Sequence, residues 1–290
     1  MSTTTLLRQN FTSQDLTVII AAHNPLGARV AERAGFDGIW ASGFELSASY
    51  GVPDASLISM TQHLEMVRAI SGAVGIPVVA DIDTGYGNAI NAAHAVSQYE
   101  FAGAAGVVIE DKTFPKETSL LAGARQELVR VEEFEGKIEA ALNARRDKDF
   151  MVIARTEALI AGLGNKEALF RAARYVKAGA DAILVHSKSK TPDEIIEFIY
   201  GWNVDAPLVL VPTAYPALDE AEIARLGKVK AVIYGNHTVR AIVSALEDVY
   251  AQIRREKGIA KVHDRIASVE HIFELQGVDD MKRLERKYVR

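Results

Sequence analysis

The stretch Val78-Val79-Ala80-Asp81-Ile82-Asp83 decides the fold class, because it is a short, continuous apolar run that ends in acidic residues. Seven further runs of this kind recur along the chain, at 18–22, 38–41, 106–110, 151–156, 182–187, 208–213 and 231–236. Apolar runs without polar alternation are typical of strands buried on both faces, as in a parallel sheet that is covered by helices. The sequence therefore predicts eight buried strands.

Helix-like segments separate these strands, at 27–34, 62–71, 88–101, 131–145, 166–178, 192–200 and 219–226. Three of these helices close on an Ala-Gly pair, at Gly35, Gly103 and Gly179, and glycine tolerates the left-handed backbone that ends many helices. This alternation favours an α/β fold of the (β/α)8 TIM-barrel type over an open, doubly wound sheet, although the pattern does not itself show that the sheet closes.

Two more helices are predicted beyond the eighth strand, at 237–257 and 262–275. The second places four apolar residues on one face, Ile266, Val269, Ile272 and Phe273. This is more apolar surface than the outer ring of a barrel needs. The helix could pack against a neighbouring subunit or fold back on its own barrel, and the sequence is equally consistent with both. We therefore expect a barrel over 1–257 and a helical extension over 258–290, which the first interpretation makes intersubunit.

The composition narrows the classes of function. The 290-residue chain contains no cysteine, and its 33 basic and 38 acidic side chains leave a net charge of −5. Without cysteine there is no disulfide framework, thiolate metal site or cysteine nucleophile, and a cytoplasmic location is the default. The chain starts without the features of a signal peptide, and no apolar run approaches the roughly 20 residues that cross a bilayer. Dispersed charges argue against nucleic-acid binding, so small-molecule chemistry is the leading class.

Polar residues collect at the C-terminal ends of the predicted strands, where barrels of this type carry their catalytic groups: Ser42, Asp81, Asp83, Glu110, Arg155, His186, Thr213 and Asn236. Asp81 and Asp83 are two residues apart and can share one face of a strand. With Glu110 they form an oxygen-rich set that suits a hard cation such as Mg²⁺, which keeps several waters. The alternative is that these acids cap the following helices or pair with Lys112 and Arg155.

Arg155 and His186 are candidates for binding an anion. A guanidinium can bind two oxygens of an anionic group at once, although a structural ion pair of Arg155 with Glu110 or Glu157 is equally consistent with the sequence. Beside such an arginine, His186 would donate or transfer a proton; otherwise it is a hydrogen-bonded core histidine.

Three loops have the composition of possible ligand-binding or closing segments: 83–88, 161–164 and 112–123. The glycines of 83–88 and 161–164 match neither a dinucleotide fingerprint nor a P-loop, so nucleotide binding is not expected. The polar segment 112–123 follows the fourth strand and is long enough to be a lid over the site, or it is an ordinary surface loop.

Six motifs carry a resemblance to a known family: Trp40-Ala41-Ser42-Gly43, Gly51-Val52-Pro53-Asp54, Ala80-Asp81-Ile82-Asp83-Thr84-Gly85-Tyr86-Gly87, Ile109-Glu110-Asp111-Lys112, Ile153-Ala154-Arg155-Thr156-Glu157-Ala158 and Ala178-Gly179-Ala180-Asp181-Ala182. On these motifs the chain resembles the phosphoenolpyruvate mutase/isocitrate lyase superfamily across nearly its whole length. The lyases of that superfamily carry Lys-Lys/Arg-Cys-Gly-His in a gating loop. This chain has Phe114-Pro115-Lys116-Glu117-Thr118-Ser119 there, so a C–C lyase is not expected.

The gating loop is similar to that of the phosphonate-handling branch, in which the mutases have Lys-Thr-Asn-Ser. This chain has Lys116-Glu117-Thr118-Ser119, so that Thr118 replaces the asparagine. The resemblance therefore implies hydrolysis of 3-phosphonopyruvate to pyruvate and phosphate, because a short β-branched side chain leaves room for water where a two-donor amide would hold the phosphoryl group. The alternatives are the mutase reaction, which interconverts phosphonopyruvate and phosphoenolpyruvate, and hydrolysis of a C–C bond in an oxaloacetate-type substrate.

The resemblance also implies how the cation and the substrate carboxylate are bound. Asp81 would bind Mg²⁺, for which Mn²⁺ or Co²⁺ can substitute, while Asp83 and Glu110 would hold its waters and Asp54 would support that network. The backbone N–H groups around three consecutive residues would bind the carboxylate of the α-keto acid substrate: Ser42, Gly43 and Phe44.

The remaining roles concern the phosphonate and the assembly. Arg155 and His186 would bind the phosphonate group, and Lys116 and Thr118 would close over it. The family further implies a homotetramer, a dimer of dimers whose subunits exchange their last helices, which favours the intersubunit interpretation of 262–275.

Overall fold

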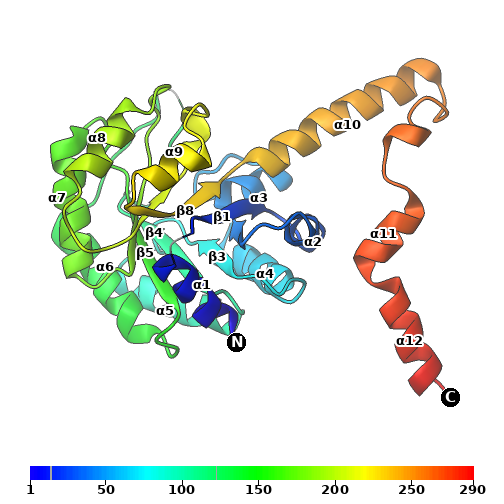
Figure 1. Ribbon diagram of the computed structural model, residues 1–290, viewed down its shortest axis with the longest axis horizontal. Helices are drawn as coiled ribbons and strands as arrows, with labels where there is room; N and C mark the ends of the chain where they lie inside the picture. Colours follow the sequence, from blue (N-terminus) through cyan, green and yellow to red (C-terminus); the bar gives the residue numbers. More distant parts are fainter. Residues whose placement is uncertain (14, 122) are drawn as a thin grey trace. The chain divides into compact units, whose positions relative to one another are not determined.

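Eight parallel strands close into a barrel in the computed structural model, which describes residues 1–13, 15–121 and 123–290 (Figure 1). The strands are β1 (Thr17–Ala22), β2 (Gly38–Ala41), β3 (Val78–Asp81), β4 (Gly106–Glu110), β5 (Met151–Thr156), β6 (Ala182–Val185), β7 (Leu208–Leu210) and β8 (Val229–Tyr234). Each strand pairs with the next in the chain, and β1 pairs with β8, with Ile19 opposite Ile233. The predicted TIM-type barrel is confirmed.

Helices cover the outside of the barrel, as the alternation of the sequence predicted. They are α2 (Pro25–Arg33), α4 (Met60–Ser71), α5 (Ala89–Phe101), α6 (Val131–Ala144), α7 (Gly164–Lys177), α8 (Asp193–Gly201) and α9 (Glu220–Arg225). Two short elements, α3 (Gly43–Ser49) and η1 (Pro212–Ala214), follow β2 and β7. All residues of β3, β4 and β5 are buried, which agrees with strands covered on one face by helices and on the other by the barrel interior.

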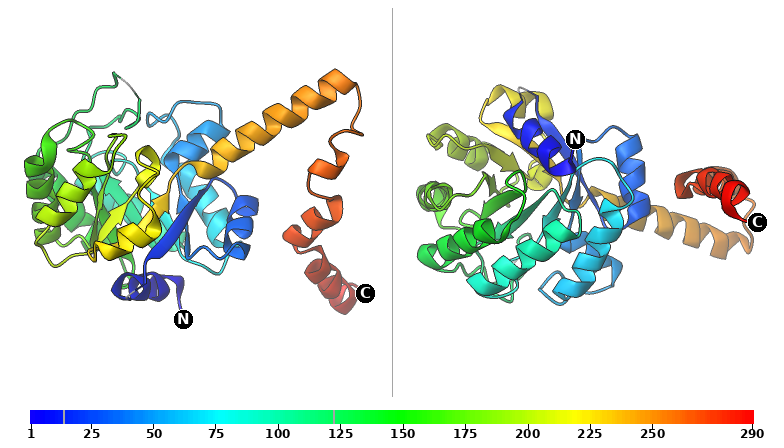
Figure 2. Two further views of the ribbon diagram at one scale, coloured as in Figure 1. Left: turned by 45° about the horizontal axis from the view of Figure 1, so that its top comes forward. Right: turned by 90° about the horizontal axis from the view of Figure 1, so that it is seen from below.

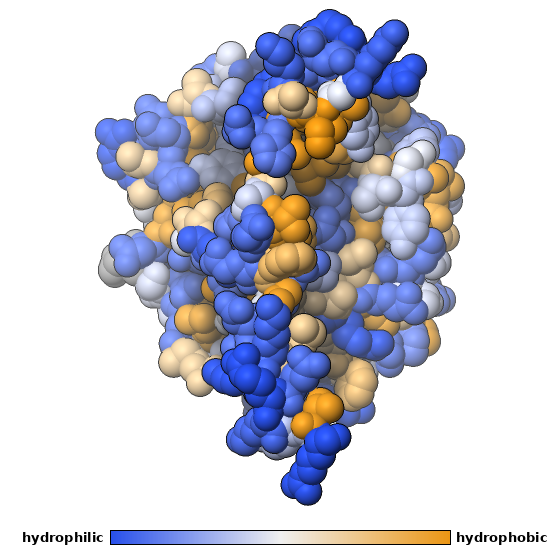
Figure 3. Space-filling model, turned by 90° about the vertical axis from the view of Figure 1, so that its right-hand side faces the viewer, coloured by the Kyte–Doolittle hydropathy of each residue, from blue (hydrophilic) through white to orange (hydrophobic). Residues whose placement is uncertain are grey.

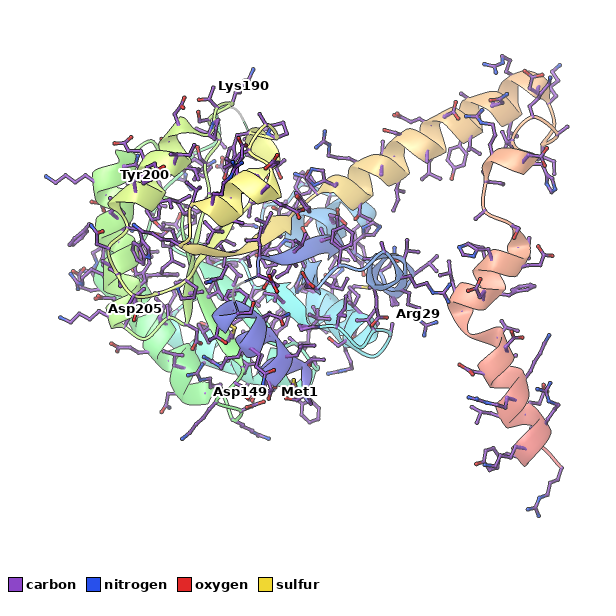
Figure 4. All side chains as sticks on the ribbon, viewed as in Figure 1. Met1, Arg29, Asp149, Lys190, Tyr200 and Asp205 are labelled. Carbon is purple, nitrogen blue, oxygen red and sulfur yellow. The ribbon has the colours of Figure 1, made fainter. Side chains whose placement is uncertain are left out.

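The helix α1 (Thr3–Thr12) precedes the barrel and was not predicted. Leu7 and Phe11, four residues apart, are buried among the side chains of the barrel interior. The hydroxyl of Thr5 donates to the carboxylate of Asp149, at 2.6 Å. Asp149 lies in the segment that leads into β5 and is labelled in Figure 4. Figure 2 shows α1 beneath the N-terminal ends of the strands. The helix α1 therefore packs against the N-terminal end of the barrel, opposite the end at which the polar strand-end residues lie.

The chain forms two compact units, Met1–His237 and Thr238–Arg290. The second contains nearly all of α10 (His237–Glu256), together with η2 (His263–Arg265), α11 (Val269–Gln276) and α12 (Val278–Tyr288). No helix in the described part of the chain is long and apolar enough to span a membrane. The functional division, a barrel over 1–257 and an extension over 258–290, stays a prediction.

The prediction of two helices beyond β8 is wrong in two respects: the structure has a further helix, α12, and the helix expected over 262–275 is wrong in its first half. Ser268 is the N-cap of α11, and its hydroxyl accepts from the backbone N–H of His271, at 3.1 Å, so the helix begins only at Val269 and excludes Ile266. Several apolar side chains of this unit are exposed: Ile242, Val243, Leu246, Tyr250, Ile266, Val269, Phe273, Met281 and Leu284. Hydrophobic residues among hydrophilic ones are visible on the face shown in Figure 3.

Candidate functional site

A cavity opens at the C-terminal end of the barrel and contains most of the predicted site residues. Its lining includes Ser42, Phe44, Asp54, Asp81, Lys116, Thr118, Arg155 and His186, together with Ser119 and Thr213. A smaller cavity beside it is lined by Gly43, Asp54, Asp81 and Asp83, among others. Residues that are far apart in the sequence thus meet because seven strands, β2 to β8, or the loops that follow them contribute to the lining of the cavity, with Asn236 after β8.

A larger hollow of about 650 Å³ lies at the other end of the barrel, beside α1. Its cationic groups are already bound by the protein: Arg8 Nη2 lies 2.9 Å from Asp181 Oδ1, and Lys230 Nζ donates to the carbonyl of Ser13, also at 2.9 Å. These contacts fix α1 to the barrel. The groups that match the predicted chemistry lie at the C-terminal end.

Asp81 and Asp83 face one position at the rim. Asp81 ends β3, and its Oδ1 accepts the backbone N–H of Asp83, at 3.2 Å. A Cβ on Gly43 would lie 3.3 Å from Asp83 Oδ1 and 3.5 Å from Asp81 Oδ2. Both carboxylates therefore meet the space that glycine leaves open at the start of α3. The predicted third strand extended to Asp83, but the backbone turns left-handed there, with φ 51°, so β3 ends two residues earlier.

Glu110, at the end of β4, has a carboxylate without a hydrogen bond. It is 1% exposed, and among the described residues neither oxygen has a hydrogen-bond partner; its closest cation is Arg155, whose Nε lies 3.4 Å from Oε2. A buried carboxylate that lacks hydrogen bonds is costly unless a cation or ordered water meets it. The rim therefore fits a hard cation through an all-oxygen set.

The acids do not form a closed cage of direct ligands. Within the described part of the chain no group of three or more His, Asp or Glu side chains is arranged to hold a metal ion by itself. Mg²⁺ commonly keeps several waters and takes one or two carboxylates directly. The spacing of these acids thus fits a hydrated cation better than one that is fully enclosed by protein ligands.

Lys116 contacts two of the acids from the loop after β4. Its Nζ lies 2.7 Å from Asp83 Oδ1 and 3.2 Å from Asp54 Oδ2. Burial raises the pKa of Asp83 to about 7, with Lys116 opposing the shift and neighbouring carboxylates adding to it. Burial alone would lower the pKa of Lys116, but Asp54 and Asp83 outweigh it and raise that pKa well above the usual value. Lys116 is thus a fixed positive charge among the acids.

Arg155, on β5, is held in place by three side chains. Its Nε donates to Glu157 Oε1, and its Nη2 lies 3.1 Å from Ser119 Oγ and 3.0 Å from His186 Nδ1. These hydrogen bonds use Nε and Nη2, so that among the described residues Nη1 has no hydrogen-bond partner and can bind an anion. Arg155 can therefore form its ion pair with Glu157 through Nε and still bind a substrate anion through Nη1.

The proton of His186 can be placed from its neighbour. A guanidinium only donates, so His186 Nδ1 accepts at 3.0 Å, and the neutral ring carries its proton on Nε2. Burial lowers the pKa of His186, which keeps it neutral near pH 7. Nε2 is buried and has no hydrogen-bond partner within the described residues, while the side chain lines the cavity. His186 is therefore an available N–H donor.

The loop after β4 contacts the rim over its described residues; Ala122, within the predicted segment 112–123, lies outside them. Thr118 Oγ1 donates to the carbonyl of Asp54, at 2.8 Å, and Ser119 Oγ donates to Glu157 Oε2, at 2.6 Å. Lys112 Nζ donates to Ser119 Oγ, at 2.7 Å. This segment is therefore fixed to the mouth of the barrel, as a closed lid would be.

Helix capping is not the role of the rim acids. The N-cap of α5, the helix after Asp81 and Asp83, is Asn88, whose side chain accepts from two backbone N–H groups. Two serines had no role assigned from the sequence: Ser56, which hydrogen-bonds Asp83, and Ser119, which hydrogen-bonds Arg155. No local pattern marked Ser56, whereas Ser119 stands in the gating-loop motif 116–119, and only the fold of the two loops shows which charged groups these serines contact.

Comparison with known proteins places these features in one family. The family model for phosphoenolpyruvate phosphomutase matches residues 7–254. The chain is 60% identical to the phosphonopyruvate hydrolase of Variovorax sp. (strain Pal2), over 98% of both chains. It is 44% identical to the phosphoenolpyruvate phosphomutase of Tetrahymena pyriformis, over 99% of this chain and 95% of that one.

A solved structure is similar to the chain over its whole length. The crystal structure of a phosphonopyruvate hydrolase in complex with oxalate and Mg²⁺ covers 100% of both chains, with a TM-score of 0.96 and 57% sequence identity. The likeness extends over the C-terminal helices as well as the barrel, because the whole of each chain is matched.

Proposed function

This chain belongs to the phosphoenolpyruvate mutase/isocitrate lyase superfamily, and on that premise we propose that it is a Mg²⁺-dependent phosphonopyruvate hydrolase. The observation that carries the proposal is Thr118: the loop has threonine where the mutases of the superfamily have asparagine, and the hydroxyl proton of Thr118 is already donated to the Asp54 carbonyl. The higher identity to a hydrolase, 60% against 44% for a mutase, supports the same assignment.

The reaction requires a negative charge to be stabilised on the organic fragment. The P–C bond breaks with its electron pair on carbon, the oxygen of water bonds to phosphorus, and the methyl group of pyruvate gains a proton. Mg²⁺, when bound, supplies the positive charge that neutralises the developing charge on the carbonyl oxygen. Asp81 would bind it directly, and Asp83, Glu110 and Asp54 would orient its waters.

The substrate carboxylate would lie next to these acids. The backbone N–H groups of Ser42, Gly43 and Phe44 would bind it, and Ser42 and Phe44 line the cavity. Gly43 leaves space beside Asp81 and Asp83, and a side chain there would crowd their carboxylates. Backbone donors of this kind hold an anion without adding a charge that would compete with Mg²⁺.

Arg155 and His186 would bind the phosphonate oxygens from the opposite wall. Arg155 would donate from Nη1 and His186 from Nε2, two donors that the protein itself leaves unused among its described residues. Both would stabilise the charge that spreads over the phosphoryl oxygens as the P–C bond loosens. Lys116 would add positive charge from the loop and hold Asp83 and Asp54 in position.

Thr118 would determine what accepts the phosphoryl group. Because its only proton is donated to Asp54, its oxygen can accept a hydrogen bond from water but cannot donate one to the phosphonate. A water that donates to Thr118 Oγ1 keeps a lone pair free for phosphorus. An asparagine at this position would offer two N–H donors to the phosphoryl group, which favours its return to the organic fragment.

Phosphorus NMR tests the proposal directly. With phosphonopyruvate and Mg²⁺ we expect the phosphonate resonance to be replaced by inorganic phosphate, with one pyruvate formed for each phosphate. Phosphoenolpyruvate as the product, without inorganic phosphate, would show a mutase instead. Turnover of oxaloacetate with none of phosphonopyruvate would place the enzyme among the C–C hydrolases.

Thr118→Asn is expected to change the product ratio as well as the rate. The amide restores two donors to the phosphoryl group, so phosphoenolpyruvate should appear beside phosphate, while hydrolysis falls by about 10²-fold, the lower end of the range for loss of one positioned group. Thr118→Ser is the matched control, because it keeps the hydroxyl and should give phosphate alone. Phosphate as the sole product of both variants would contradict this role of Thr118.

The assembly and location of the enzyme are part of the proposal. The exposed apolar residues of the C-terminal unit support a homo-oligomer, a dimer of dimers in which last helices are exchanged between subunits. The absence of cysteine supports a cytoplasmic location. Sedimentation of the full chain would test the first, with a tetramer as the expected species.

A further inference from the structure

The loop 83–87, which carries Asp83, has an unusual backbone. Four of its five residues adopt a positive φ: Asp83 at 51°, Gly85 at 85°, Tyr86 at 60° and Gly87 at 147°. Gly85 requires the absence of a side chain, because a Cβ there would lie 2.9 Å from Ile109 Cδ1. For a tyrosine such a φ is an outlier that persists only when the surrounding structure holds it. Contacts with neighbouring residues must therefore hold Tyr86 in this backbone conformation.

A chain of hydrogen bonds connects Tyr86 to the end of β2. Tyr86 Oη lies 2.8 Å from Tyr99 Oη on α5, and the two rings are stacked with centroids 6.5 Å apart. Tyr99 Oη lies 2.7 Å from His63 Nδ1 on α4, and His63 Nε2 lies 3.1 Å from the carbonyl oxygen of Ala41. Tyr99 and His63 are almost completely buried.

The direction of each hydrogen bond between Tyr86 and Ala41 follows from the last acceptor, the Ala41 carbonyl. The Ala41 carbonyl only accepts, so His63 carries its proton on Nε2. Burial lowers the pKa of His63, which keeps the ring neutral and leaves Nδ1 as an acceptor. Tyr99 must then donate to His63, and Tyr86 must donate to Tyr99. Every donor and acceptor between Tyr86 and Ala41 has one defined partner.

The same loop is held from its other side and lies against the acids. Lys137, from α6, donates its Nζ to the carbonyl of Thr84, at 3.0 Å. Asp83 contributes its carbonyl to the backbone N–H of Glu110, at 2.9 Å. Tyr86 and His63 line the small cavity that Asp81 and Asp83 also line. A change in Tyr86 would therefore reach the position of the Asp83 carboxylate through the loop backbone.

We propose that Tyr86 is a positioning residue of the cation site: through Tyr99 and His63 it holds the loop 83–87 in the conformation that presents Asp83, and so sets the affinity of the site for a divalent cation. The inference rests on the proposed function, because it concerns the cation which that function requires. Groups that orient metal ligands without touching the metal commonly affect affinity by about 10- to 100-fold.

The experiment compares three tyrosine-to-phenylalanine variants of the full chain, each titrated with Mg²⁺ by isothermal calorimetry. Tyr86→Phe and Tyr99→Phe each remove one hydroxyl from the chain and should bind Mg²⁺ about tenfold more weakly than the wild type. Tyr215→Phe is the matched control: it also removes a buried hydroxyl, but one without a hydrogen-bond partner among the described residues. Its affinity for Mg²⁺ should be that of the wild type.

Kinetics and thermal unfolding give independent readouts. In Tyr86→Phe the Mg²⁺ concentration for half-maximal pyruvate formation should rise with the dissociation constant, while kcat at saturating Mg²⁺ stays unchanged. Tyr99→Phe should lose more thermal stability without metal, because it leaves both the Tyr86 donor and the His63 acceptor without partners, whereas Tyr86→Phe leaves only one lone pair unused.

Each outcome bears on the inference. Equal Mg²⁺ affinity in all three variants and the wild type, whatever their melting temperatures, would show a merely structural network and overturn it. Weakened binding in Tyr86→Phe alone would also overturn it, since the effect would not pass through Tyr99. Absence of Mg²⁺ binding by the wild type would instead overturn the proposed function, and with it the premise of the inference.

Discussion

Arg155→Lys is expected to lower kcat/KM for phosphonopyruvate by about 10³-fold, because two kinds of contact are lost together. The guanidinium holds Glu157, Ser119 and His186 at once, and an ammonium cannot reproduce that planar arrangement. It also offers Nη1 to the phosphonate. Release of the His186 ring would allow its Nε2 donor to turn away from the substrate.

The measurement is the steady-state rate of pyruvate formation at saturating Mg²⁺. Arg174→Lys is the matched control, because Arg174 lies on the outer surface of α7, where it pairs with Glu135, and its replacement should leave the rate unchanged. Mg²⁺ affinity should change little in Arg155→Lys. A variant that kept a tenth or more of the wild-type activity would remove Arg155 from the proposed anion site.

Asp81→Asn is expected to remove Mg²⁺-dependent turnover, with a loss of at least about 10³-fold, and EDTA should do the same to the wild type. Asparagine keeps an oxygen that can accept the Asp83 N–H, so the loop keeps this hydrogen bond and the change is chiefly one of charge. The expected effect thus reports the direct carboxylate ligand rather than the collapse of the rim.

Calorimetric titration with Mg²⁺ and the pyruvate assay check this prediction together. Asp219→Asn is the matched control: Asp219 is the N-cap of α9, where asparagine serves equally well, so both affinity and rate should be retained. Wild-type turnover that continued unchanged in EDTA would exclude the metal-dependent mechanism. Tight Mg²⁺ binding by Asp81→Asn would instead move the direct ligand to Asp83 or Glu110.

The barrel could be predicted from the sequence because its strands are buried on both faces and therefore read as continuous apolar runs. The strand ends were less accurate. The predicted runs to 83, 187 and 213 include polar residues that follow β3, β6 and β7, and three of these residues line the cavities at the rim: Asp83, His186 and Thr213. These three residues therefore lie just after the last residues of their strands.

The helices α1 and α11 differ from the prediction for different reasons. The first, α1, begins with three threonines, which have low helix propensity, and is stabilised by tertiary burial of Leu7 and Phe11 rather than by its own sequence. At 262–275 the apolar spacing suggested one helix, but the cap at Ser268 divides the segment. Long-range packing thus determines that α1 forms, whereas a local cap determines where α11 begins.

The residues of the site could be predicted from the sequence, but the contacts between them could not. Asp81, Arg155 and His186 were placed at the rim because each follows or ends a strand. The loop that brings Lys116 to Asp83 and Ser119 to Arg155 has no periodic pattern, so only the folded chain shows which charges it meets. The proton positions on His63 and His186 likewise depend on partners from other elements.

The pairing of β1 with β8 has a consequence for synthesis of the protein. β1 begins at residue 17 and β8 ends at residue 234. At typical translation rates β8 is therefore synthesised on the order of tens of seconds after β1. During that time the edge of β1 and the interior side chain of Ile19 lack their final cover. The barrel therefore cannot close before β8 has been synthesised.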